Sequence, residues 1–205
     1  MRHAPGVDDD PEHLDTAALT ALWERRWPGC RYSPHELRVD AADRWVRFHA
    51  LPGSQRYPGT PAEHATVLRR HRTLLAEVLP GPRLLLVTAD YADGPEPPAT
   101  RRALVAALNP GARHWTSARI SDDPGFESWM HLYAGRVGRF DERLDEVLRA
   151  VADNRIANVL LADLDLHRLY HPYDGGMDVL LPTTAERDAL RERHRAWRPA
   201  GGGDL

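Results

Sequence analysis

Two strand patterns flank one clearly marked helix in the first half of the chain, and this order constrains the fold more than any other feature. Apolar and polar residues alternate over 44–50, which is typical of a strand with one buried face. Thr60 and Glu63 fit a capping box with proline at the first helical position, which predicts a helix over 60–79. The aliphatic segment 84–91 predicts a buried strand. The chain therefore combines helices and strands.

The rest of the 205 residues continues this mixture. The further predicted elements are helices at 15–27 and 99–108, after Asp141 and after Thr183, a hairpin of 113–121 with 126–134, and three short strands within 158–181. We predict an α+β fold, namely a single-domain mixed β-sheet with helices packed on its faces. It is expected to begin with β-α-β crossovers and to end in a meander plus a C-terminal helix.

The two ends of the chain differ from the rest in composition. Residues 1–12 and 199–205 are polar or rich in glycine and proline, so they offer little to bury. We therefore predict a flexible N-terminal tail over 1–12, a single α+β domain over 13–198 and a flexible C-terminal tail over 199–205.

The composition excludes several kinds of site. All 27 basic residues are arginine, so this sequence holds no Schiff-base lysine, no pyridoxal-phosphate anchor and no P-loop lysine. The net charge of -3 argues against a nucleic-acid partner. The sequence also lacks the motifs of serine hydrolases, zinc proteases and dinucleotide-binding folds. We expect neither a cofactor nor a metal.

The same sequence is typical of a soluble cytoplasmic protein. Cys30 is the only cysteine and cannot form an internal disulfide, which fits a reducing compartment. The longest aliphatic run, 84–87, is far shorter than the ~20 residues of a membrane span. The first residues contain no apolar segment typical of a signal peptide. We expect no association with a membrane.

The connection from the first strand to the capped helix is the main candidate site. It leaves the carboxyl end of a strand and enters the amino end of a helix, whose free amides attract anions. Arg56 lies in this loop, while Arg47 and His49 share one strand face. His71 interrupts an apolar helical stripe, where an imidazole needs a hydrogen-bond partner. The alternative is that the loop is only a turn, that its arginines are solvated and that His71 is a satisfied core histidine.

A second polar group lies near the C-terminus. It consists of Asp163, Asp165, His167, His171, Tyr173 and Asp174. In an extended chain its odd-numbered members would share a face and could hold a divalent metal. A turn near 163–166 and a Tyr-Asp-Gly-Gly hairpin turn would break that alignment. The polar face of an outer hairpin explains these residues without a metal.

Several of these stretches resemble the bacterial family of domain of unknown function 3885. They are "RFHALPGSQRYP", "VLRRHRTLL" and "LYHPYDGGMDVLL" with "AERDALRERHRAW", and the similarity spans about 44–197. The resemblance implies no known reaction. It implies that the functional residues are Arg47, His49, Ser54, Arg56, Tyr57, Arg70, His71, Tyr173 and Asp174.

Two functions are consistent with this pattern. The favoured one is a cytoplasmic binding or accessory protein, not an enzyme, that recognises a protein partner or a small anionic ligand at the loop 51–60. The alternative is a small hydrolase or transferase that acts on a phosphate- or carboxylate-bearing substrate. Arg47 and Arg56 would then hold the anion while His49 or His71 transferred a proton.

Overall fold

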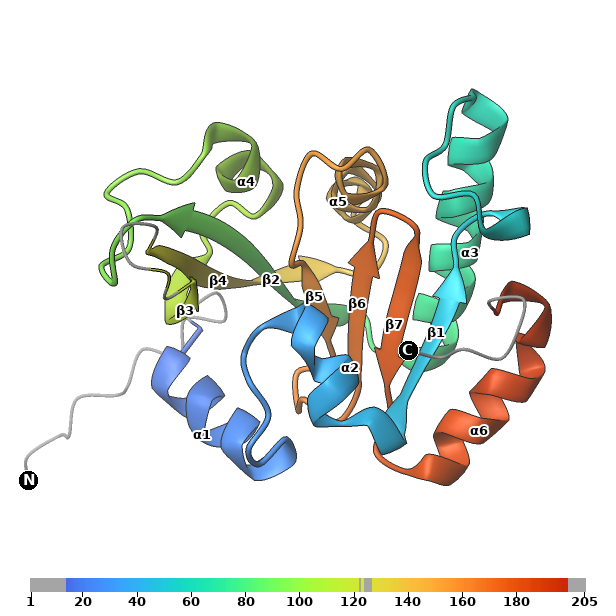
Figure 1. The fold of residues 1–205 in the computed structure, drawn as a ribbon, viewed down its shortest axis with the longest axis horizontal. Coiled ribbons are helices and arrows are strands. Elements are labelled where there is room, and N and C mark those ends of the chain that lie inside the picture. The colour runs from blue at the N-terminus through green and yellow to red at the C-terminus, as the bar shows by residue number, and fades with distance from the viewer. Residues whose placement is uncertain (1–13, 122, 124–126, 199–205) are drawn as a thin grey trace, which may run out of the picture.

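The computed structural model describes residues 14–121, 123 and 127–198. The predicted tails, 1–12 and 199–205, lie outside the described residues. Seven strands form one sheet in the order β1-β7-β6-β5-β2-β4-β3, and every pair of neighbours is antiparallel (Figure 1). The predicted single α+β arrangement is therefore confirmed at the level of fold class.

The elements have the following bounds. The strands are β1 (Trp45–His49), β2 (Arg83–Ala92), β3 (Arg113–Ser121), β4 (Ser128–Gly138), β5 (Leu160–Ala162), β6 (Leu169–Tyr173) and β7 (Gly176–Leu180). The α-helices are α1 (Thr16–Arg26), α2 (Leu37–Asp40), α3 (Pro61–Val78), α4 (Ala103–Leu108), α5 (Glu142–Ala152) and α6 (Thr184–Arg193). A 3₁₀ turn, Pro34–Glu36, leads directly into α2.

The predicted mixed sheet and its β-α-β crossovers are wrong. β1 and β2 do not pair, because β7, β6 and β5 lie between them. The edge strand β1 pairs instead with β7, which comes from the opposite end of the chain. A strand pattern shows which residues can be buried, but it does not show which distant strand supplies the hydrogen-bond partner. The predicted closing meander, β5-β6-β7, and the helix after it are confirmed.

The helix α3 begins where the capping box predicts. The Thr60 hydroxyl accepts a hydrogen bond from the Glu63 amide at 3.2 Å, and the Glu63 carboxylate accepts from the Thr60 amide at 3.0 Å. Val67, Leu74 and Val78 lie on its buried side. The local start signal and the apolar stripe together place α3 against the sheet.

The sheet has a core on each face. The helices α4 and α5 lie at the top of the view in Figure 1 and α3 runs down its right side, and all three pack on the face that carries Phe48. The opposite face carries Trp45 and packs on α1 and α2 through Trp23 and Leu37. No helix in the described ranges is both long enough and apolar enough to cross a membrane.

Candidate functional site

Three neighbouring strands change from apolar to polar along one face of the sheet. Trp45 of β1 belongs to an apolar row that packs in the core with α1 and α2. Two residues further along, Arg47 of β1, Asp178 of β7 and His171 of β6 form the next row on the same face. The strands therefore bring charged and titratable side chains together where that core ends.

Arg47 and Asp178 form a two-pronged ion pair in this row. Arg47 Nε donates to Asp178 Oδ1 at 2.8 Å, and Arg47 Nη2 donates to Oδ2 at 2.9 Å. The guanidinium also lies over the rings of Trp45 and Tyr173, 5.1 and 4.9 Å from their centroids. Since Asp178 is buried, the pair fixes the position of the Arg47 charge.

The following row is open because its middle residue is a glycine. Gly176 pairs with His49 on one side and with Tyr173 on the other. A Cβ atom at Gly176 would lie 2.1 Å from Phe48 O and 2.9 Å from Tyr173 Oη. The close strand contact and the position of the Tyr173 ring both depend on this glycine.

The loop 50–60 forms one wall beside this face. Asp174, in the turn between β6 and β7, accepts hydrogen bonds at Oδ2 from Arg56 Nε at 2.8 Å and from Tyr57 Oη at 2.9 Å. These two bonds attach the loop to the end of the sheet. Arg56, Tyr57 and Asp174, three of the predicted site residues, are thereby in direct contact.

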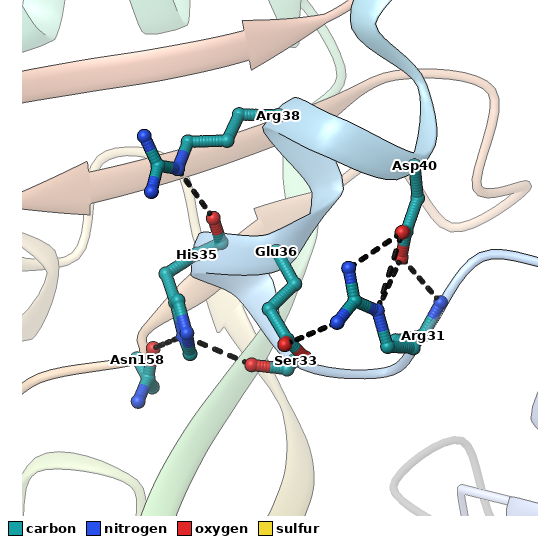
Figure 2. A network of polar contacts seen from close by, with 7 residues as sticks. All are labelled: Arg31, Ser33, His35, Glu36, Arg38, Asp40 and Asn158. Carbon is teal, nitrogen blue, oxygen red and sulfur yellow. Dashed lines mark hydrogen bonds and ion pairs between the residues drawn. The ribbon is translucent and has the colours of Figure 1, made fainter. Parts of the chain in front are cut away.

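The segment 31–40 forms the opposite wall, and its own polar contacts hold it in place (Figure 2). Arg31 pairs with Asp40 and Glu36. His35 Nδ1 lies 2.9 Å from Ser33 Oγ and 3.2 Å from Asn158 Oδ1. Arg38 Nε donates to the His35 carbonyl at 3.2 Å, and Figure 2 shows its guanidinium on the other side of the segment from Asp40.

A groove of about 620 Å³ lies between these walls. The cationic and titratable side chains that line it are Arg38, Arg47, Arg56, His35, His49 and His171, and the remainder of its lining is Ser54, Tyr173, Asp174 and Gly175. This volume is in the range of small-molecule sites. The groove joins six of the nine predicted ligand-binding residues and adds His35, Arg38 and His171.

The imidazole of His49 is partly buried at the end of β1. Burial lowers its pKa, and the nearby charges of Arg47 and Arg70 lower it further. Its Nε2 atom is buried and has no hydrogen-bond partner among the described residues. Because its pKa is lowered, this ring is uncharged at neutral pH.

His171 and Tyr173 are also neutral groups in the groove lining. His171 Nδ1 donates to the Val159 carbonyl at 2.8 Å, and burial lowers the pKa of this histidine. Burial raises the pKa of the Tyr173 hydroxyl far above its usual range. The positive charge of the groove therefore comes from its arginines.

Three predicted residues, Tyr57, Arg70 and His71, do not line the groove. Tyr57 is bonded to the groove residue Asp174, whereas Arg70 and His71 lie elsewhere. His71 lies in the core of the opposite face, where its Nδ1 and the Tyr170 hydroxyl share a hydrogen bond of 2.8 Å. Burial lowers the pKa of His71 to about 3. Arg70 Nη1 donates to the His49 carbonyl at 2.8 Å, and its guanidinium lies over the Trp197 ring. Arg70 thus holds the end of β1, and His71 is a satisfied core histidine.

The amino end of α3 differs from the expected anion site. The Glu63 carboxylate accepts hydrogen bonds from the Gly59 amide at 2.7 Å and from the Thr60 amide at 3.0 Å. Gln55 Nε2 also donates to this carboxylate at 3.1 Å. The protein's own carboxylate therefore occupies the helix tip, and the groove lies beside the loop instead.

The residues considered for a metal do not assemble into a metal centre. Asp163 Oδ1 accepts from the His167 amide at 2.7 Å, so it closes the turn that the sequence predicts there. His171 is in the sheet, and Asp174 holds Arg56 and Tyr57. Within the described residues, no three of His, Cys, Asp and Glu side chains are arranged to bind an ion.

Two groove residues and one supporting residue were absent from the predicted set. His35 and Arg38 lie in a helix too short to leave a periodic pattern. Asp178 supports Arg47, and its position inside the otherwise apolar strand β7 is a signal that it has a buried partner. For His171 the sequence pattern indicates only a possible metal ligand.

The fold and the groove define an α+β protein with one antiparallel sheet and a cationic cleft at the end of β1, β7 and β6. The chain belongs to the family described as Domain of unknown function (DUF3885), whose model matches residues 33–200. This range includes every residue that lines the groove. No curated protein and no solved structure matches the chain.

Proposed function

We propose that this protein binds a small anionic ligand, carrying a phosphate or a carboxylate, in the groove. The observation that carries the proposal is the convergence of Arg38, Arg47 and Arg56 on one cleft from three different elements. Asp178 balances Arg47, and Asp174 balances Arg56. In the described part of the chain, Arg38 has no carboxylate partner, so the groove keeps an excess positive charge.

The shape of the site supports a small ligand more than a protein partner. The groove is concave, and its arginines are held by hydrogen bonds before any ligand arrives. Prepositioned donors bind an anion without a large cost in side-chain entropy. The neutral imidazoles of His49 and His171 add hydrogen-bonding groups without adding charge.

The test is calorimetric titration of the whole chain with inorganic phosphate and, separately, with succinate. Arg38→Gln is expected to weaken binding of the preferred anion about 10-fold, because a hydrogen bond to a charged group is worth roughly 1.5 to 3 kcal/mol. Arg69→Gln is the matched control, since Arg69 is exposed on α3 and its side chain contacts Thr66. That variant should bind like the wild type.

Two results would contradict the proposal. One is that neither anion binds the wild-type protein at millimolar concentration, and the other is that both variants lose affinity equally. The same material tests the alternative, a small hydrolase or transferase. Turnover of p-nitrophenyl phosphate that disappears in His49→Gln while phosphate affinity persists would favour that alternative.

A further inference from the structure

A second, smaller chamber of about 210 Å³ adjoins the groove. The segment between α5 and β5 supplies Asn154, Ile156 and Ala157 to its lining, and we call this space the side chamber. His171 and Tyr173 line both spaces. The two spaces therefore lie side by side.

The two spaces differ in charge. Arg38 and Arg47 line the groove but not the side chamber. Arg56 lines both, but Asp174 neutralises it. An anionic group is accordingly favoured in the groove, whereas the side chamber offers two amides, imidazoles and a few apolar atoms. Its lining suits an uncharged polar group.

The imidazoles in the shared lining present hydrogen-bond acceptors. His171 Nδ1 donates to the Val159 carbonyl, so Nε2 carries the lone pair of the neutral ring. His35 Nδ1 donates to Asn158 Oδ1, because Asn158 Nδ2 already donates to the Tyr91 hydroxyl at 2.8 Å. Nε2 is then the ring nitrogen of His35 that these contacts leave for a bound molecule. Such acceptors pair with donors, and hydroxyl groups are the common uncharged donors of small metabolites.

The backbone of the lining has an unusual conformation. Among the described residues, four other than glycine have a positive φ, and three of these, Ser54, Asn154 and Asn158, line the groove or the side chamber. Positive φ is unfavourable for residues other than glycine and is concentrated at functional sites, asparagine being the most tolerant of it. The chain at Asn154, with φ of 53°, turns sharply at the end of α5 and brings the residue to the side chamber.

We infer that the ligand is a hydroxylated phosphomonoester, such as a sugar or polyol phosphate. This inference rests on the proposed function and specifies the ligand for the same site. The phosphate lies in the groove with Arg38 of the segment 31–40 and Arg47 of the sheet, which approach it from different elements and can contact several of its oxygens. The hydroxyl groups lie in the side chamber, where they donate to His35 and His171 and pair with the Asn154 amide.

The test compares ribose 5-phosphate with inorganic phosphate by calorimetry on the whole chain. Wild-type protein is expected to bind ribose 5-phosphate at least about 10-fold more tightly, since several neutral hydrogen bonds are added. Asn154→Gly removes the amide side chain but keeps a residue that adopts positive φ readily, so the fold should persist. This variant should bind ribose 5-phosphate about 3- to 10-fold more weakly and bind inorganic phosphate normally.

The outcomes separate this inference from the proposed function. Equal affinities for the two compounds, or equal losses for both in Asn154→Gly, would overturn the side-chamber assignment while leaving anion binding in place. If neither compound binds but succinate does, the groove takes carboxylates and the phosphomonoester is wrong. If no anion binds at all, the proposed function itself fails. Arg38→Gln, which should weaken both phosphates, is the control for the groove.

Discussion

The two halves of the sheet each bury an aspartate beside an arginine, yet only one of these pairs opens onto the groove. In the groove half, Asp178 holds Arg47 below a cleft. In the other half, Asp90 accepts from the Arg102 amide at 2.7 Å and from Arg102 Nε at 2.9 Å. There the connection after β2 folds back over the strands and supplies the partners. The comparison shows that similar residues become a candidate site only where no backbone covers them.

Three polar side chains in the second half, His114, Ser117 and His131, form a connected set of hydrogen bonds. Ser117 Oγ lies 2.9 Å from His114 Nε2 and 2.8 Å from His131 Nδ1. His131 Nε2 donates to the Gly94 carbonyl at 3.2 Å. In contrast, His49 in the groove half has a buried Nε2 with no partner in the described part of the chain. Trp129 Nε1 and Tyr133 Oη of β4 are also buried without a partner among the described residues, so an unsatisfied polar atom does not by itself mark a site.

Glycine substitutions give the largest expected difference in unfolding free energy between the two halves of the sheet. Gly176→Ala would place its Cβ 2.1 Å from the backbone oxygen of Phe48, so β1 and β7 would have to separate. We expect a loss of about 3 kcal/mol or more in unfolding free energy, the upper range for overpacking. Gly135→Ala would place its Cβ 2.4 Å from Oδ1 of Asn109, a side-chain atom rather than a backbone atom, and should cost about 1 to 2 kcal/mol.

Urea unfolding monitored by tryptophan fluorescence measures both values. If Gly135→Ala proved the more damaging substitution, the groove-side strand pair would be the more tolerant one. The expectation that a clash with a backbone atom costs more than a clash with a side-chain atom would then be wrong.

Replacement of the two buried aspartates is the next largest test. Asp178→Asn removes a negative charge beside Arg47, whose side chain is only 24% exposed, and should cost about 3 kcal/mol. Asp90→Asn affects Arg102, which is 51% exposed and can be solvated, so about 1 kcal/mol is expected. Denaturant midpoints at constant pH measure the difference. Equal losses would show that Arg47 without its aspartate is hydrated as well as Arg102 is.

The smallest expected effect is the change in unfolding free energy with pH that comes from His71. This residue lies in the core on the other face of the sheet from the groove. In the folded protein His71 has a pKa of about 3, below its ordinary 6.5, so the unfolded chain binds more protons between these values. The stability that neutral His71 supports is present above pH 6.5 and is lost as the pH falls. Below pH 6, the contribution of His71 should lower the unfolding free energy by up to about 1.4 kcal/mol for each pH unit.

Unfolding free energies between pH 7 and pH 5 test this expectation. His71→Gln should be less stable at pH 7 but should show a shallower decline toward pH 5. His49 and His171 also have lowered pKa values, so part of the slope should persist in the variant. An unchanged slope would mean that His71 does not contribute to the acid sensitivity.

The elements that depend on nearby residues were predictable. The capping boxes at Thr60 and Thr183 mark the starts of α3 and α6, because each N-cap contacts the residue three positions later. The hairpin of β3 with β4 and the meander also follow from alternation and turns. The segment 34–40 was missed because a single helical turn leaves no repeating pattern.

The sequence by itself determined the identity of most strands and helices, the burial of their apolar sides and the polar character of the loop 50–60. Only the tertiary structure decided that Arg47 faces Asp178 of a strand 131 residues away, and that Arg38 closes the opposite wall. It also decided that His71 is fully buried, whereas His49 is only partly buried. The physical reason is range: caps and alternation act between close neighbours, whereas strand pairing and the covering of a surface depend on the whole packed chain.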